Sequence, residues 1–504
     1  MYYLRSLLLL LSGLLLAEAA LANGDLIPVT RNLDPINHPV LSREEYQTRH
    51  SYQETSFREL NRVRTAVGDT DPNRTERNLL IIVDFDLQLQ IATALDRYQQ
   101  DLQLQQLSSI LVAFNGTSVE NLRSLILEYD DSEALSGVFL IGDLPTAWFE
   151  LYDDFDDDGV PDEEWASVFP CDLFFSDLDG LWADLDLNGN YDFHGGGMEP
   201  DIWIGRIKGD NLSLAPASEA DLINSYFERN HLFRQGFLTT SNTALAYVDD
   251  DWASGGNEFA AALANGWDEV ELIDHINDTN AEDYRSARLP ADYDYIQVMV
   301  HSGPDAHYFY WNDHQDYELV ENWELHGINP TARFYNLFAC SNAHFETDNS
   351  MGSLYLLDND HGLIAVGSTK TGSMLYFEDY YTPLGADSTF GAAMQHWWTQ
   401  NVDVNGVVNM WRRSWFYGMV TLGDPALKTH YPRIRPENLM IFYSEDQVLL
   451  EWDDLPGVIA WRVYSSAEPN GDFLLDGTGV FTGSSWQASC SEQQRFYRVT
   501  AVLE

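Results

Sequence analysis

Two stretches, YIQVMVHSG (residues 295–303) and ARFYNLFACSNAHF (residues 332–345), decide the fold predicted for this chain. Each begins with an unbroken apolar run, which is typical of a strand buried on both faces of a parallel sheet. Each run is followed at once by a reactive side chain, His301 in the first stretch and Cys340 in the second. With a helix expected over residues 313–325, the two strands would be neighbours in a βαβ unit whose carboxyl ends share one edge of the sheet.

His301 and Cys340 at one sheet edge would place an imidazole beside a thiol, where open α/β sheets bind ligands. A thiol becomes a strong nucleophile when it ionises, and a neighbouring imidazole can take its proton or stabilise the thiolate. These two residues are the candidate catalytic pair, and the backbone N–H of Gly303 is a candidate oxyanion donor. The alternative interpretation is a buried core cysteine and an unrelated loop histidine.

Outward from these stretches, apolar runs and helical spacings alternate along most of the chain. The alternation predicts an α/β fold of two tandem α/β subdomains with mainly parallel sheets, with helices on their faces. The expected strands are residues 79–83, 108–114, 137–143, 201–207, 243–251, 269–274, 295–300, 332–339 and 362–368. The expected helices are residues 87–103, 118–129, 220–234, 257–265, 313–325 and 388–417.

Changes in composition predict the domain boundaries. The apolar run Leu7–Leu16 is too short for a comfortable membrane span, and Ala20-Leu21-Ala22 offers a cleavage site, so an exported protein is expected. Its location would be secreted, cell-surface or periplasmic. The predicted segments are a signal peptide at 1–22, an N-terminal extension or pro-segment at 23–78, α/β subdomains at 79–230 and 231–432, and an immunoglobulin-like or fibronectin type III-like β-sandwich at 433–504.

Two acidic loops, DFDDDGVPD (154–162) and DLDLNGNYD (184–192), interrupt the first series of strands. Both match positions 1, 3, 5, 6 and 9 of a calcium-binding loop, but neither has glutamate at position 12. Structural calcium is expected at one or both loops, because carboxylates so close together repel one another unless a cation is bound. The alternative is a pair of solvated acidic loops. The candidate metal ligands are Asp154, Asp156, Asp158, Asp162, Asp184, Asp186, Asn188 and Asp192.

The composition is strongly acidic, with 27 basic residues, 80 acidic residues and a net charge of −53. A field of this sign repels phosphate groups, which argues against nucleic acids and anionic membranes as partners. Lysine is scarce and occurs only as Lys208, Lys370 and Lys428. Protein or peptide substrates remain the expected partners, no organic cofactor is expected, and the oligomeric state is left open.

The number of cysteines and the spacing of histidines argue against a disulfide scaffold and against a three-histidine zinc site. Three cysteines, Cys171, Cys340 and Cys490, are too few and odd in number for a disulfide scaffold. A zinc site from the histidines at 301, 307 and 314 is disfavoured, because their spacing does not put them on one helical face and no HExxH motif occurs.

Seven motifs carry a resemblance to a known family: GVFLIGDLP, PCDLFFSDLDG, DIWIGRI, VMVHSG, ACSNAHF, GLIAVGST and TLGDPALK, in this order. The chain resembles the gingipain-type cysteine peptidases, which have a caspase-like fold, over most of residues 79–430. The resemblance implies a non-catalytic first subdomain, a catalytic second subdomain with a His301–Cys340 dyad, and an immunoglobulin-like domain behind. Ser302 is a departure, because the family usually has glycine directly after the histidine.

The resemblance also implies a carboxylate that orients the histidine. Three acidic residues, Asp249, Asp250 and Asp251, end the strand predicted over 243–251, and Asp249 and Asp250 are the preferred candidates. The function expected for the chain is that of a secreted, calcium-stabilised cysteine endopeptidase. The alternatives are a non-catalytic protein of the same fold that acts in secretion or binding, and a surface adhesin that works through its β-sandwich.

Overall fold

The computed structural model describes residues 40–65, 78–162, 166–238, 241–311, 314–431, 438–444, 446–453, 458–469, 471, 473–489 and 494–503. The predicted signal peptide therefore lies outside the described residues. The chain divides into two compact units. The larger unit comprises residues up to Asn230 together with Thr240–Thr429, and the smaller comprises His231–Thr239 together with His430–Glu504. No helix in the described ranges has the length and apolar character needed to cross a membrane.

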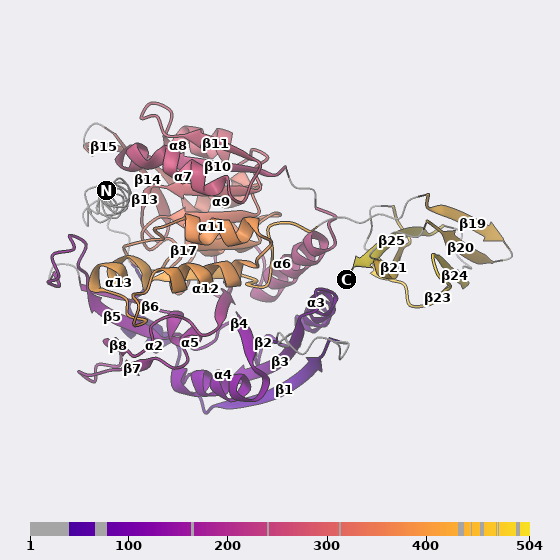
Figure 1. Ribbon diagram of the computed structural model, residues 1–504, viewed down its shortest axis with the longest axis horizontal. Coiled ribbons are helices and arrows are strands. Elements are labelled where there is room, and N and C mark those ends of the chain that lie inside the picture. Colours follow the sequence, from indigo (N-terminus) through magenta and orange to yellow (C-terminus); the bar gives the residue numbers. More distant parts are fainter. Residues whose placement is uncertain are drawn as a thin grey trace, which may run out of the picture. The chain divides into compact units, whose positions relative to one another are not determined.

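The larger unit is built on one 11-stranded sheet, in which eight of the ten neighbouring pairs are parallel (Figure 1). The mainly parallel α/β fold is thus confirmed. The strands, in their order across the sheet, are β1 (Ser56–Val63), β3 (Ser108–Asn115), β2 (Asn78–Asp84), β4 (Leu135–Ile141), β9 (Trp203–Ile207), β18 (Met419–Gly423), β17 (Ile364–Ser368), β16 (Phe334–Phe338), β12 (Tyr295–Met299), β10 (Thr243–Val248) and β11 (Glu269–Ile273).

The two series of strands share this sheet, and β18 joins them. It pairs antiparallel with β17 along its whole length and parallel with β9 through Leu422 and Arg206. The second series therefore runs opposite to the first. All the strands expected from apolar runs are present, whereas β18 and the edge strand β1 were not predicted as strands.

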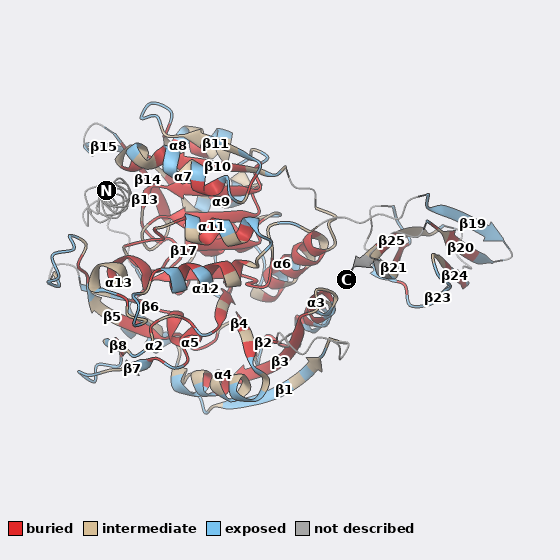
Figure 2. Ribbon diagram, in the orientation of Figure 1, coloured by how far each residue is buried: buried red, intermediate tan, exposed pale blue. Residues whose placement is uncertain are grey.

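Helices cover the sheet, and burial on both faces explains the unbroken apolar runs of its central strands. Figure 2 shows these strands buried, whereas β1 at the edge is largely exposed. Of the last three helices, Glu378–Gly385 and Phe390–Gln400 lie side by side (Figure 1), and Phe390–Gln400 contacts Met410–Phe416 through the rings of Trp397 and Phe416, 4.6 Å apart. The helices are α3 (Ala92–Leu104), α4 (Val119–Glu133), α5 (Leu173–Ser176), α6 (Glu219–Arg234), α7 (Gly256–Leu263), α8 (Ala281–Asp283), α9 (Asn322–Ile328), α10 (Met351–Leu357), α11 (Glu378–Gly385), α12 (Phe390–Gln400) and α13 (Met410–Phe416). A 3-10 helix (Asp250–Gly255) and a π-helix (Tyr284–Arg288) are also present.

The helix predicted over residues 313–325 is wrong for most of its length. The chain after β12 instead forms the antiparallel strands β13 (His301–Ser302), β14 (Ala306–Trp311) and β15 (Asp316–Glu321), and α9 begins only at Asn322. The sequence AHYFYW of β14 is rich in aromatic residues, which favour strands. The strands β12 and β16 are nevertheless parallel neighbours, as expected, with Val298 opposite Leu337.

The described part of the N-terminal extension is integrated into the larger unit. Its helix α2 (Arg43–Arg49) begins with a capping box, in which the Ser42 side chain accepts from the Glu45 N–H. The backbone N–H of Leu41 donates to Thr347 Oγ1 at 3.0 Å, and β1 adds an antiparallel edge strand to β3. Residues 40–65 thus contact both β3 and the segment that follows β16.

The smaller unit contains two antiparallel sheets that share a core of Val448, Leu450, Trp452, Val463, Trp486, Ala488 and Val499. This is the arrangement of a small β-sandwich. One sheet contains β19 (Met440–Ser444), β20 (Gln447–Glu451), β24 (Ser485–Ser489) and β23 (Val480–Phe481), and the other contains β22 (Leu474–Leu475), β21 (Val458–Ser466) and β25 (Phe496–Leu503).

Candidate active site

The candidate site lies where four neighbouring parallel strands, β10, β12, β16 and β17, reach their carboxyl ends. His301 follows β12 and Cys340 follows β16. The two segments are in direct contact, because Ser302 Oγ donates a hydrogen bond to the carbonyl oxygen of Cys340 at 2.7 Å. Ser302, the residue that departs from the family pattern, therefore holds the histidine segment against the cysteine segment.

His301 is held by one carboxylate. Its Nε2 donates to Asp251 Oδ2 at 2.6 Å, and its ring packs against Trp252 with centroids 4.5 Å apart. Burial lowers the pKa of His301 below its usual value, although the hydrogen bond to Asp251 opposes that shift. Nδ1 of His301 has no hydrogen-bond partner among the described residues, so this atom is available to a reacting group.

Asp251, rather than Asp249 or Asp250, contacts the histidine, which corrects the preference stated from the sequence. A 3-10 helix begins at Asp250, so successive side chains turn by about 120° and only one of the three can face His301. Asp249 is buried, and burial together with the charge of Asp250 raises its pKa to about 8. Asp251 keeps a pKa below its usual value despite burial, because His301 and His314 both hydrogen-bond to it.

Cys340 is half-buried, and burial raises the pKa of its thiol. Two neighbours oppose that increase: the backbone N–H of Gly372 and the ammonium group of Lys370. Lys370 is buried and is fixed by Asp153 Oδ1 at 2.8 Å and by the carbonyl oxygen of Ser414 at 2.6 Å. The sequence interpretation missed Lys370 and Gly372, although both follow the strand predicted over 362–368 and lie at the same sheet edge.

Gly303 does not offer a free oxyanion donor. Its N–H donates to the carbonyl oxygen of Ala306 at 3.1 Å, because the chain turns there from β13 into β14. Its own carbonyl oxygen accepts from Asn342 Nδ2 at 2.9 Å, which ties the histidine turn to the segment after Cys340. The backbone N–H groups that lie against the Cys340 sulfur are those of Gly372 and of Cys340 itself.

The segment that carries the Cys340 thiol contacts the segment that carries an imidazole oriented by a carboxylate, and these are the groups that a cysteine peptidase uses. The model of peptidase family C25 matches residues 73–430 of the chain, well over half of its length. The chain belongs to peptidase family C25, the gingipain family. No curated protein matches the chain. Membership in the C25 family makes this protein a cysteine-type peptidase, a hydrolase with protein substrates.

The first acidic loop of this C25 protein gathers three carboxylates. Ligand oxygens of Asp154, Asp156 and Asp158 lie within 4.8 Å of one another, between the strands β5 (Trp148–Tyr152) and β6 (Ala166–Pro170). Asp154 is only 1% exposed, and its Oδ1 has no partner among the described residues. Asp162 contributes its backbone N–H to the carbonyl oxygen of Asp153 at 2.9 Å. The group therefore has a buried carboxylate oxygen to which a cation could bind.

The second acidic loop uses its polar groups internally, between β7 (Leu181–Ala183) and β8 (Phe193–Gly195). The carboxylate of Asp184 accepts from the N–H groups of Asn188 and Gly189, Asp186 also accepts from Asn188, and Asp192 accepts from Leu185. Among the described residues, the candidate ligands of this loop form no cluster of three carboxylates. A cluster that the sequence did not suggest, Asp177, Asp179 and Asp201, lies elsewhere in the same half.

The other sulfur and histidine candidates are dispersed. His307 is buried against Tyr355, with 3.2 Å between Nε2 and the hydroxyl oxygen, and burial lowers its pKa to about 3. His314 instead reaches Asp251 Oδ2 with its Nε2 at 2.8 Å. Cys171 is a buried free thiol with a raised pKa, and Cys490 lies outside the described residues.

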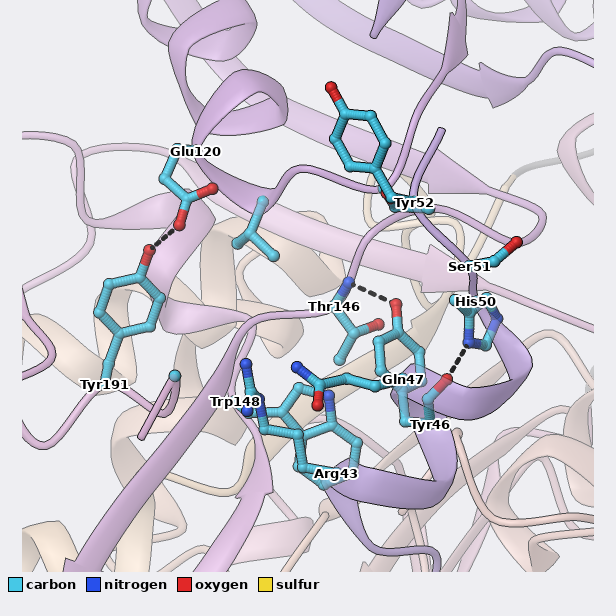
Figure 3. Close-up of a pocket in the computed structure, with 13 residues that line it drawn as sticks. Arg43, Tyr46, Gln47, His50, Ser51, Tyr52, Glu120, Thr146, Trp148 and Tyr191 are labelled. Atoms are coloured by element: carbon cyan, nitrogen blue, oxygen red, sulfur yellow. Dashed lines mark hydrogen bonds between the residues drawn. The ribbon is translucent and has the colours of Figure 1, made fainter. Parts of the chain in front are cut away.

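A cavity of about 390 Å³ lies in the first half of the molecule, and Figure 3 shows the side chains around it. Helix α2 lines one side with Arg43, Tyr46 and Gln47, and Trp148 and Tyr191 line the other. Neither His301 nor Cys340 is among its lining residues. The cavity is therefore separate from the candidate active site.

Proposed function

We propose that this C25 protein is an exported endopeptidase that cleaves peptide bonds with Cys340 as nucleophile and His301 as general acid and base. Asp251 orients His301 and stabilises its protonated form. The observation that carries the proposal is the contact between the two segments, in which Ser302 Oγ reaches the Cys340 carbonyl oxygen at 2.7 Å while Asp251 holds the far side of His301 at 2.6 Å.

The pKa directions support a neutral pair in the resting enzyme. Burial raises the pKa of Cys340 and lowers that of His301, so both groups are expected to be uncharged near neutral pH. The thiol proton would move to Nδ1 of His301 as the sulfur attacks the peptide carbonyl carbon. His301 would then donate this proton to the leaving amine nitrogen, which leaves a thioester on Cys340.

The second half of the reaction hydrolyses that thioester. A water molecule would give a proton to Nδ1 of His301 and attack the acyl carbon, which releases the carboxylic acid product and restores the thiol. Negative charge on the substrate oxygen would be stabilised by the backbone N–H groups beside the sulfur, those of Cys340 and Gly372. Lys370, close enough for its charge to lower the pKa of Cys340, would favour every step in which the sulfur is anionic.

Calcium binding is proposed for the loop that contains Asp154, Asp156 and Asp158. The buried and unpartnered Asp154 Oδ1 supports an oxygen-liganded cation there, because a buried anionic oxygen without a partner is costly. The second loop has weaker support, since its candidate ligands form no cluster of three carboxylates among the described residues. Export is proposed from the N-terminal apolar run alone.

The test is peptide cleavage by purified protein in the presence of a reductant and calcium, with a mixed peptide library as substrate. Cys340→Ala and His301→Ala should each abolish turnover, while Cys171→Ala serves as the matched control and should leave turnover unchanged. Iodoacetamide should label Cys340 in the native protein faster than the buried Cys171. Wild-type turnover by Cys340→Ala would show that the assignment is wrong and would favour a binding role for the fold.

A further inference from the structure

We propose that Asp251, His301 and His314 bind a transition-metal ion of the zinc class, and that the bound ion reversibly inhibits the enzyme. The donor set is two imidazole nitrogens and one carboxylate oxygen, which zinc prefers and calcium does not. The metal site follows from the geometry of these three side chains, whereas its inhibitory effect rests on the proposed function.

The three ligand atoms already converge. His301 Nε2 and His314 Nε2 lie 2.6 and 2.8 Å from the same oxygen, Asp251 Oδ2, and all three atoms are within 4.8 Å of one another. Tetrahedral zinc with ligand bonds of about 2.1 Å separates its ligand atoms by about 3.4 Å. A zinc ion therefore fits after each nitrogen moves from the oxygen by less than about 1 Å.

Packing holds both imidazole rings in place around this point. The ring of His301 lies between Trp252 and Tyr310, with centroid distances of 4.5 and 5.7 Å. The ring of His314 packs on the same tyrosine at 5.4 Å, nearly perpendicular to His301. Because the rings are held before an ion arrives, little ordering of side chains opposes metal binding.

The site is open on one side and lies in a favourable field. The side chain of His301 is 6% exposed, whereas that of His314 is 35% exposed, so an ion can enter past His314. A water molecule from this side would supply the fourth ligand, as in sites with three protein ligands. The negative charge of Asp250 also acts on His301, and the chain as a whole has a net charge of −53.

Occupation of this site would disable His301 through its tautomer. Coordination through Nε2 requires the lone pair of that nitrogen, so the proton of the neutral ring must be on Nδ1. Nδ1 is the atom that takes the thiol proton in the proposed reaction, and a protonated Nδ1 cannot accept it. Removal of the metal by a chelator returns the proton to Nε2 and restores the hydrogen bond to Asp251.

The direct test is calorimetric titration of zinc chloride into the full chain, with excess calcium present to saturate the acidic loops. One zinc ion per chain is expected for the wild type. His314→Ala and Asp251→Asn should weaken zinc binding by at least about 10-fold. The matched control is His326→Ala, since His326 is another exposed histidine on a carboxylate, Asp358, and should leave zinc affinity unchanged.

Two further arms separate the metal site from the peptidase assignment. Cys340→Ser should bind zinc as the wild type does. A large loss of zinc affinity in this variant would show that the Cys340 thiol is a zinc ligand and would overturn the proposal. Unchanged zinc affinity in His314→Ala would also overturn it. In the activity arm, zinc should inhibit the wild type, and inhibition of His314→Ala should need at least about 10-fold more zinc. A wild type without turnover in zinc-free buffer would refute the peptidase assignment, while calorimetry would still decide the metal site.

Discussion

Each half of the sheet buries a lysine, and the two differ in what surrounds them. Lys208, directly after β9, contacts Asp143, Asp210 and Glu346, and these carboxylates raise its pKa despite burial. Lys370, two residues after β17, has one carboxylate partner among the described residues, Asp153, and burial lowers its pKa. These are two of the three lysines in the chain.

The difference shows how similar burial can serve two purposes. Three carboxylates more than neutralise Lys208, so its role is to hold together Asp143 after β4 and Glu346 from the segment after Cys340. Around Lys370, one carboxylate and two backbone carbonyl oxygens leave the positive charge free to act on Cys340. The first lysine is expected to govern stability and the second the chemistry of the thiol.

The largest effect is expected from Lys208→Met, which leaves three neighbouring carboxylates without their cation. Breaking a buried ion pair on one side costs about 3–5 kcal/mol, so the free energy of unfolding should fall by about that amount. Urea denaturation measures it. Lys428→Met is the matched control, because Lys428 forms a partly exposed pair with Asp387, and its loss should cost less than about 1 kcal/mol. An equal fall in the free energy of unfolding in the two variants would contradict the proposed role of Lys208 in stability.

A smaller and different effect is expected from Lys370→Met combined with Asp153→Asn, which removes the ammonium group without leaving an unpaired carboxylate. The pKa of Cys340 should rise, because the charge of Lys370 lowers this pKa more than the charge of Asp153 raises it. Labelling by iodoacetamide at pH 7 should slow by roughly 10-fold, equivalent to about 1.4 kcal/mol, and its pH profile should move to higher pH.

The control for this experiment is Lys208→Met, measured at a temperature where the variant is folded. It should label Cys340 at the wild-type rate, since its lysine does not act on the thiol. A labelling rate unchanged by the loss of Lys370 would contradict the comparison, and mass spectrometry of the labelled peptides provides the measurement.

The smallest effect concerns the acidic loop that follows Asp153. Calcium should raise the melting temperature of the wild type by mass action, with up to about 2.7 kcal/mol of stabilisation at 100 times the dissociation constant. Asp154→Asn should abolish most of this increase, whereas Asp184→Asn should retain it, because only Asp154 has a buried and unpartnered oxygen. If both variants lose the calcium-dependent rise in melting temperature equally, the first loop is no better a calcium site than the second.

The sequence predicted the buried parts of the fold better than its connections. Unbroken apolar runs located strands such as β2, β12 and β16, because burial on both faces leaves a signal in every residue. The strand β18 carries no comparable run in its segment MVTLG, and its place in the sheet depends on pairing with β9 and β17, far away along the chain. The helix expected over residues 313–325 failed because Asp316–Glu321 pairs with the aromatic-rich strand β14, which lies outside that segment.

In the candidate site, too, the sequence predicted some features and missed others. The contact between the segments that carry His301 and Cys340 followed from strand order, which the sequence indicates. The choice of Asp251 among three consecutive aspartates depends on a 3-10 helix that begins at Asp250, and no pattern in the sequence specified that turn. Lys370 and Gly372 act on the thiol across separate strand ends, and this proximity becomes visible only in the folded chain.

The central position of β18 has a consequence for how the protein is made. It is the last strand of the sheet along the chain, yet it lies sixth of eleven, with five strands on either side. During synthesis, the growing chain must keep the edges of β9 and β17 unpaired until Met419–Gly423 is available to fill the gap. Such long-range pairing is slow, and open edges invite aggregation. The completed sheet is therefore a late event, so a nascent chain that stops before residue 419 cannot assemble it.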